Sequence, residues 1–351
     1  MAWQWKWRQP SILVRGAEEF ERVEIPVYRS TGGPLFKTLL SSGCRMDCKY
    51  CPFARFCRTR REAWNPDKLV RVFLEAYRRG VVKGLFLSSA LYGDPERVSS
   101  DVVSVAEKLR QAGYKGYIHL RLMPGTPPDT IRRALSVANR VGINLEAPSP
   151  SAFSDIAPSK GSWSLDIYSK LLYAARIARS PRRVDTQLVL GASGETDRDV
   201  LVLVSTLLSR GVGVVHFSPY TPVPGTPLAR KRRQTPLWRA RLLYEALVLL
   251  RDYHFDLREI EAALNEHGYF PPINTRLKEY IAVLHPEWFP VDPSSASYKE
   301  LLRVPGVGPS AARRIIETRS SGGLSVTILR RLLGARWRKA QKYLDLSSIR
   351  K

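Results

Sequence analysis

The 351-residue chain has few cysteines and few histidines, and both shortages exclude classes of protein. Four cysteines are too few for a disulfide scaffold in a chain of this length. The five histidines are scattered and no second CxxC is present, which disfavours a structural zinc site with paired ligands. No apolar run reaches the roughly 18 residues of a membrane-spanning helix, and the opening segment MAWQWKWRQP lacks a secretory apolar core. We therefore expect a protein of the reducing cytoplasm with no membrane partner.

Acidic residues are also scarce. There are 32 Asp and Glu against 56 Lys and Arg, a net charge of +24, while hydrophobic residues make up 44% of the chain. That composition indicates a folded protein rather than a disordered basic tail. Residues 296–351 hold 13 Lys or Arg and only 3 Asp or Glu, a net +10. The concentrated charge favours a polyanionic partner, and a generally basic surface is the alternative.

Three of the four cysteines follow the spacing CxxxCxxC within the segment GCRMDCKYCPF. Cys44, Cys48 and Cys51 can hold three irons of a four-iron, four-sulfur cluster, which usually takes four cysteines. The fourth iron is then open, and an open position on a metal is where chemistry occurs. Cys57 lies nearby, and we expect it to be a spectator thiol, with an auxiliary-cluster ligand as the alternative.

Short apolar runs alternate with amphipathic helices from residue 35 to about residue 218. The runs lie near 35–41, 84–89, 116–122, 141–147, 184–191 and 212–218. Asn65 is the expected cap of the first helix, and Ser100 with Asp101 is expected to open the second. Alternating strands and helices predict a parallel sheet with right-handed crossovers. Six such units, rather than eight, predict an open partial barrel with its active residues at the carboxyl ends of the strands.

The chain is predicted to have four parts. Residues 1–34 form an N-terminal extension, in which Trp3, Trp5 and Trp7 indicate an edge strand. The partial barrel follows, then a helical extension, and the proline-rich segment PEWFPVDPSS marks the start of a small all-α module. The partial barrel is predicted at residues 35–230, the helical extension at 231–293 and the all-α module at 294–351.

The cysteine motif, with Tyr50 directly before its last cysteine, resembles that of the radical S-adenosylmethionine (SAM) superfamily. The resemblance implies an α/β fold, a partial (β/α)6 barrel, with a [4Fe-4S] cluster whose open iron takes the amino and carboxylate groups of SAM. Cleavage of SAM would give a 5′-deoxyadenosyl radical that abstracts hydrogen from a substrate. An electron donor such as ferredoxin or flavodoxin is also implied. The catalytic residues of the substrate reaction stay unassigned.

The resemblance also suggests where SAM is held. Ser88 and Ser89 stand where the superfamily contacts the methionine amino group, although the usual glycine-glycine-glutamate form is absent. Asn144 and Glu146 point the same way by strand alternation, and Glu146 could accept hydrogen bonds from ribose or substrate. The stretch LVLGASGETD (188–197) resembles the adenine-contacting segment. The candidate cofactor-binding residues are Tyr50, Ser88, Ser89, Asn144, Glu146, Gly191 and Glu195.

The tail contains LLRVPGVGPSAARRIIETR (301–319), in which a PGVG turn separates two helical stretches. This pattern resembles the helix-hairpin-helix motif of DNA-binding and repair proteins. Its glycines permit a tight turn, and backbone N–H groups beside a helix start can cradle a phosphate. A degenerate second hairpin is expected to turn at Gly334. The candidate DNA-binding residues are Pro305, Gly306, Val307, Gly308, Ser310, Arg313 and Arg314, and an αα-hairpin used for protein packing is the alternative.

The whole layout resembles one group of radical SAM proteins, described as DNA modification or repair proteins with a C-terminal helix-hairpin-helix. Arg121 departs from that group, where a lysine is expected. The leading hypothesis is an enzyme that binds nucleic acid, DNA in preference to RNA, through the tail and acts on a flipped or unpaired nucleotide. The alternatives are an RNA-modifying radical enzyme and a non-catalytic DNA-binding protein with a structural or redox-sensing cluster.

Overall fold

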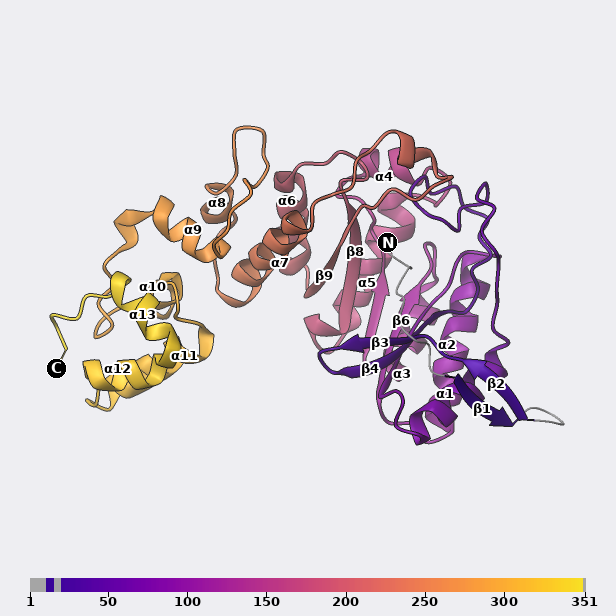
Figure 1. Cartoon of the computed structure of the whole chain (residues 1–351), viewed down its shortest axis with the longest axis horizontal. Coiled ribbons are helices and arrows are strands. Elements are labelled where there is room, and N and C mark those ends of the chain that lie inside the picture. The colour runs from indigo at the N-terminus through magenta and orange to yellow at the C-terminus, as the bar shows by residue number, and fades with distance from the viewer. Residues whose placement is uncertain (1–10, 16–19, 350–351) are drawn as a thin grey trace. The chain divides into compact units, whose positions relative to one another are not determined.

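The structure is a computed structural model that describes residues 11–15 and 20–349 (Figure 1). The expected edge strand at Trp3, Trp5 and Trp7 lies outside these residues. Two compact units are present, Met1–Glu195 with Thr206–Thr235, and Thr196–Ser205 with Pro236–Lys351. We call them the barrel unit and the helical unit. The four-part division made from the sequence stays a prediction.

Within the described residues, the barrel unit is built on a seven-stranded sheet in the order β3-β4-β5-β6-β7-β8-β9. Strand β3 pairs antiparallel with β4, and each later pair is parallel. The six parallel strands confirm the predicted α/β partial barrel, and β3 adds an antiparallel edge. The strands are β3 (Val27–Ser30), β4 (Gly33–Leu39), β5 (Gly84–Ser88), β6 (Tyr117–Leu122), β7 (Arg140–Ile143), β8 (Val184–Leu190) and β9 (Val214–Pro219). A separate two-stranded sheet joins β1 (Ser11–Arg15) to β2 (Phe20–Glu24).

Helices connect the parallel strands in turn. They are α1 (Pro66–Arg78), α2 (Pro95–Gln111), α3 (Pro128–Val137), α4 (Pro150–Ile156), the π-helix η1 (Trp163–Tyr168), α5 (Ser169–Ile177), the short 3-10 turn η2 (Pro181–Arg183) and α6 (Asp197–Ser209). Asn65 caps α1 as expected, because its side chain accepts hydrogen bonds from the Asp67 and Lys68 N–H groups at 3.0 Å. The predicted start of the second helix at Ser100 was wrong. Helix α2 begins at Pro95, where the Asp94 side chain accepts from Glu96 N–H at 2.9 Å.

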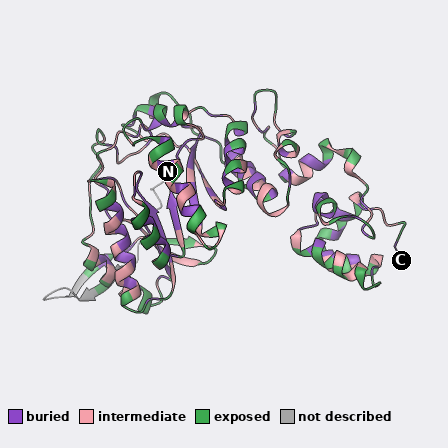
Figure 2. Cartoon of the chain, turned by 180° about the vertical axis from the view of Figure 1, so that it is seen from behind, coloured by how far each residue is buried: buried purple, intermediate pink, exposed green. Residues whose placement is uncertain are grey.

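The strands of the barrel unit are mostly buried, while the helices expose one face (Figure 2). Phe73 of α1, Val102 of α2 and Leu171 of α5 are fully buried, as are Leu85 and Ile118 of the sheet. This apolar layer fixes the strands so that their carboxyl ends form a rigid rim.

The helical unit holds the first residues of α6 and the C-terminal helices. These are α7 (Leu237–Asp252), α8 (Leu257–Glu261), α9 (Leu277–Leu284), α10 (Tyr298–Arg303), α11 (Pro309–Ser320), α12 (Val326–Leu333) and α13 (Trp337–Ala340), with the 3-10 turns η3 (Pro227–Arg230, in the barrel unit), η4 (Pro286–Trp288), η5 (Gly334–Arg336) and η6 (Gln341–Tyr343). Residues 291–349 share one apolar core that includes Leu301, Ile315 and Leu329. The C-terminal helical region expected from the sequence is therefore present. Among the described residues, every helix is too short or too polar to cross a bilayer.

Candidate active site

A cavity of about 430 Å³ lies at the carboxyl ends of the parallel strands. In barrels of this kind, the active residues follow the carboxyl ends of the strands. The position of this cavity agrees with that rule. It brings together the three motif cysteines and most of the predicted cofactor residues. The predicted residues that line it are Cys44, Cys48, Cys51, Tyr50, Ser88, Ser89, Asn144 and Glu146.

The cysteine loop, residues 42–57, is held by the side chain of Arg61. One terminal nitrogen of its guanidinium donates to the carbonyls of Ser42 and Phe53 at 3.0 and 2.8 Å. The other terminal nitrogen donates to the carbonyls of Ala54 and Cys57 at 2.8 and 3.0 Å. Arg61 thus satisfies both ends of the loop, a role that nothing in the local sequence indicates.

Neighbouring loops anchor the cysteine loop from outside. The Arg45 N–H donates to the Leu91 carbonyl and the Lys49 N–H to the Ile156 carbonyl, both at 2.8 Å. Asp47 accepts from the Ser159 hydroxyl at 2.7 Å. Cys57 is half-buried and does not line the cavity. Its expected role as a spectator thiol stays a prediction.

The thiols of the three motif cysteines would have to lose their protons to bind a metal cluster. Burial raises the pKa of Cys48 to about 12 and that of Cys51 to about 11. Because thiolates are the ligands of iron, loading the site releases protons. Within the described residues, no three Cys, His, Asp or Glu side chains converge to hold a single metal ion. A four-iron cluster needs no such convergence, since each cysteine binds a different iron, and the three thiols on one cavity fit that requirement.

Glu146 faces the cysteines from the end of β7. It is 3% exposed and has a positive φ of 65°, which is rare for a residue with a side chain. One carboxylate oxygen lies 2.5 Å from the amine of Lys160, and in the described structure the other is buried without a hydrogen-bond partner. Burial and the Glu146 charge both raise the pKa of Tyr50. An unpartnered buried acceptor beside the cysteines fits a hydroxyl or amino group of SAM.

Gly191 and Glu195 lie together in one loop, and neither lines the cavity within the described residues. The Gly191 N–H and the Ser193 hydroxyl donate to the Glu195 carboxylate at 2.5 and 2.7 Å. Gly191 has a φ of 82°. Glu195 therefore shapes the loop after β8, and its contact with adenine stays a prediction.

The interior below the cavity mouth carries a polar group that sequence reasoning missed. His119 and Arg121 of β6, Asp185 of β8 and His216 of β9 meet there. One Asp185 oxygen lies 2.9 Å from His119 Nε2, 3.0 Å from His216 Nε2 and 3.4 Å from an Arg121 nitrogen. The alternation of His119 with Arg121 in YIHLRL puts both on one face of the strand, so a period-two reading could have found them.

Burial and charge set the protonation of this group. Burial lowers the pKa of His119 to about 4, so its imidazole is neutral at pH 7. Burial alone would raise the pKa of Asp185, but the Arg121 charge and the two histidines hold it well below the usual range. Asp185 is therefore a buried carboxylate, one oxygen of which is hydrogen-bonded to Arg121 and His216 and lies close to His119 Nε2.

The predicted DNA-binding residues are all in the helical unit, around the turn between α10 and α11. Gly306 has a φ of 92°, which confirms that the turn needs a glycine there. Val307 is buried, and its carbonyl accepts from Lys278 Nζ at 2.6 Å. Ser310, Arg313 and Arg314 are exposed on α11. Pro305, Gly306, Val307 and Gly308 line a second cavity of about 800 Å³, and the basic residues around it are Arg241, Arg276, Lys278, Arg336 and Lys339.

Comparison with known proteins agrees with the cysteine cavity. Residues 38–207 match the family described as the Radical SAM superfamily. Over these residues, just under half of the chain, the protein is similar to the radical SAM superfamily. The matched family implies a [4Fe-4S] cluster and SAM as cofactors. The match does not define the substrate reaction.

Individual relatives are distant. The chain is 22% identical over 201 residues to a tRNA-2-methylthio-N(6)-dimethylallyladenosine synthase from Lachnoclostridium phytofermentans, covering 55% of this chain and 43% of that protein. The chain therefore spans less than half the length of that relative. Among solved structures, methylornithine synthase is similar with 16% identity, 62% coverage of each chain and a TM-score of 0.48. A FeFe-hydrogenase maturase from Carboxydothermus hydrogenoformans has 15% identity, 86% and 76% coverage and a TM-score of 0.49.

Proposed function

We propose that this radical SAM enzyme modifies or repairs a base or sugar of a nucleic acid, DNA in preference to RNA. Residues 294–351 would dock on the phosphate backbone as a helix-hairpin-helix module. The observation that carries the proposal is the cavity lined by the Pro305–Gly308 turn and ringed by basic side chains.

Some of the basic side chains around that cavity are already paired with carboxylates, and others are not. Arg241 and Arg276 both lie within 3.0 Å of Glu245, and Lys339 pairs with Glu279. In the described residues, no carboxylate lies within ion-pair distance of Arg336, which is exposed. One of its terminal nitrogens would lie 4.0 Å from a Cβ placed on Gly308. Arg336 is therefore beside the turn and available to a phosphate that the turn amides bind.

The surface of the tail adds further cations. A duplex bound at the turn would also lie near exposed arginines and lysines. These residues are in α11, α12 and α13 or directly next to these helices in the sequence. Contacts of this kind position the backbone without reading sequence, which suits an enzyme that finds its target by extruding a nucleotide. These exposed residues are Arg313, Arg314, Arg330, Arg331, Arg336, Arg338, Lys339 and Lys342.

In the barrel unit, Cys44, Cys48 and Cys51 would hold the cluster, and Glu146 would accept from SAM. When bound, these cofactors supply a carbon radical that abstracts a hydrogen atom from the substrate. Tyr50, pressed between Glu146 and the cysteines, closes one wall of the cavity and excludes water. The cavity is too narrow for a duplex, so the target nucleotide would have to enter unstacked.

RNA modification is the second candidate, because the relative described above is named a tRNA-2-methylthio-N(6)-dimethylallyladenosine synthase. The same basic surface would serve an RNA, and the enzyme would then act on an unpaired nucleotide of a loop. A preference of the protein for duplex nucleic acid would favour the first candidate, and a preference for single-stranded segments would favour the second.

The docking module is tested best by charge rather than by glycine replacement. A Cβ on Gly306 would meet the Arg336 carbonyl at 3.0 Å at a φ of 92°, so Gly306→Val would strain the fold itself. The variant Arg313→Gln/Arg314→Gln/Arg336→Gln keeps the turn intact. Its matched control is Arg60→Gln on the barrel unit, whose side chain is 88% exposed.

We expect the triple variant to bind duplex DNA more weakly for all sequences and to lower the log–log salt slope by about 0.9 for each phosphate that is no longer neutralised. Arg60→Gln should bind as the wild type does. The proposal fails if the triple variant keeps both the affinity and the salt slope. Tighter binding of a tRNA than of any DNA, reduced in the same variant, would move the substrate to RNA.

A further inference from the structure

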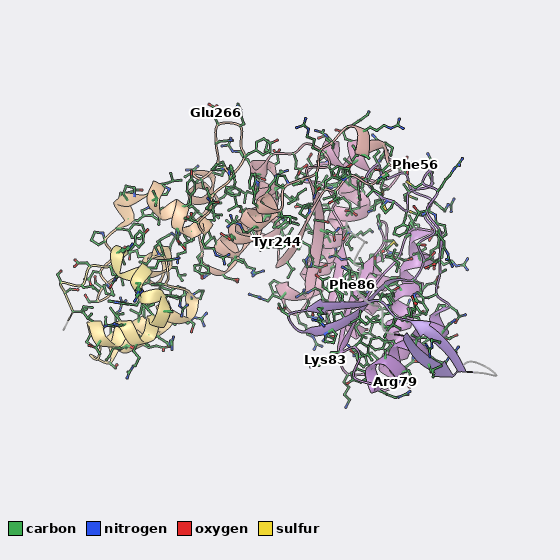
Figure 3. The ribbon with its side chains drawn as sticks, in the orientation of Figure 1. Phe56, Arg79, Lys83, Phe86, Tyr244 and Glu266 are labelled. Atoms are coloured by element: carbon green, nitrogen blue, oxygen red, sulfur yellow. The ribbon has the colours of Figure 1, made fainter. Side chains whose placement is uncertain are left out.

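The lower interior of the barrel unit is polar, although such barrels are commonly filled by branched apolar side chains. Lys37 of β4 and Arg121 of β6 both line the cavity from below its mouth. Lys37 lies two residues before the end of β4. Its neighbour Phe86, labelled in Figure 3, lies two residues before the end of β5. At about 3.3 Å per residue, this level is roughly 7 Å deeper than Leu39 and Ser88.

Lys37 has aromatic neighbours and no acidic one. Its amine lies 4.8 Å from the centre of the Tyr28 ring and 5.1 Å from that of Phe86. In the described structure, no carboxylate lies within ion-pair distance of this amine. Burial and the charge of Arg121 lower the pKa of Lys37. Aromatic faces attract a cation only weakly compared with a carboxylate, so the positive charge is left without a matching anion.

Arg121 is 5% exposed and is only partly paired. One terminal nitrogen lies 3.4 Å from Asp185, and the other donates to the Asn144 side chain. Its Nε is buried and has no hydrogen-bond partner in the described structure. Asp185 also contacts both histidines, so Arg121 does not have this carboxylate to itself. Buried and half-buried charges and donors are normally paired. The half-buried Lys37 amine and the buried Arg121 Nε are not.

We propose that Lys37 and Arg121 form a binding site for an oxyanion group of the substrate, a phosphate or a carboxylate. An oxyanion in the cavity would supply the missing negative charge, accepting from Lys37 Nζ beside the positive charge of Arg121. Resting on the proposed function, the group is a phosphate of the flipped nucleotide. Asp185, which also contacts both histidines, pairs with Arg121. Gly142 leaves room for that carboxylate, because a Cβ there would overlap Asp185.

The test is a thermal unfolding series on the full chain, reconstituted with iron and sulfide and loaded with SAM. Sodium phosphate, sodium acetate and sodium chloride are compared at matched ionic strength. A ligand of the native state alone raises Tm with its concentration. We expect phosphate to raise Tm above chloride in the wild type and in Lys115→Met, an exposed lysine control. The rise should be lost in Lys37→Met and kept in Lys37→Arg.

Without an added oxyanion, Lys37→Met should be at least as stable as the wild type, because the unmatched charge is gone. The proposal is overturned if Lys37→Met responds to phosphate as the wild type does, or if neither oxyanion exceeds chloride. It is also overturned if SAM abolishes a response that the SAM-free protein shows, since the site would then hold the cofactor's carboxylate. A response to acetate alone would keep the oxyanion site and contradict the nucleotide substrate, which separates the two proposals.

Discussion

Replacing Arg61 with Met removes four hydrogen bonds to the cysteine loop while leaving every thiol in place. Hydrogen bonds that involve a charged group contribute a net of about 1.5–3 kcal/mol each. Arg61 is half-exposed, and water would replace much of that. We therefore expect the closed loop to lose the equivalent of about one such bond, about 2–3 kcal/mol. That is about a 30- to 150-fold shift toward the open loop, at tenfold per 1.4 kcal/mol.

The assay is anaerobic bleaching of the reconstituted cluster by an iron chelator, followed by its visible absorbance. If the chelator reaches iron only when the loop opens, the bleaching rate of Arg61→Met should rise about 30- to 150-fold. The control is Arg60→Met, one residue away, whose side chain is 88% exposed and pairs only with Glu62 among described residues. Equal bleaching rates for Arg61→Met, Arg60→Met and the wild type would refute the role given to Arg61.

Three further predictions follow from the two units. Cys44→Ala, Cys48→Ala and Cys51→Ala should each abolish the cluster, measured by iron content, and Cys57→Ala should keep it; a cluster lost only in Cys57→Ala would reverse the ligand assignment. Arg303→Ala should destabilise the helical unit by about 3–5 kcal/mol in urea unfolding, because Glu259, held at 2.6 Å, loses its buried partner; Arg330→Ala, at an exposed site, should change little, and equal effects would contradict this. Burial acts to raise the pKa of Asp292, but hydrogen bonds from Ser348 and Ser294 hold it at about 2, so the stability that Asp292→Ala loses should be complete above about pH 4 and vanish as pH falls through 2; a pH-independent difference would disprove it.

The sequence alone was enough for features whose cause is local. The cysteine spacing identified the three thiols that line the cavity, and the Asn65-Pro66 pair identified the start of α1. Asp94-Pro95 has the same pattern, and it marks the true start of α2, more than one turn before the predicted start at Ser100. Alternation in YIHLRL could have placed His119 and Arg121 inside the barrel.

Other parts of the site depend on contacts that no local pattern contains. Lys160 reaches Glu146 from a loop 14 residues later. Arg61 reaches carbonyls up to 19 residues before it. The unmatched charge of Lys37 is a property of what surrounds it in three dimensions, since Tyr28, Phe86 and Arg121 come from three different strands. Such arrangements follow from the packed fold and not from residue spacing.

We propose above that the protein acts on a nucleic acid through radical SAM chemistry. The most direct measurement is the yield of 5′-deoxyadenosine and methionine from SAM by the dithionite-reduced, cluster-loaded protein, with no nucleic acid, with duplex DNA containing an unpaired site, and with tRNA. We expect SAM cleavage that is stimulated by DNA more than by tRNA, with the stimulation reduced in Arg313→Gln/Arg314→Gln/Arg336→Gln. Cleavage that proceeds equally with and without every nucleic acid tried would contradict it.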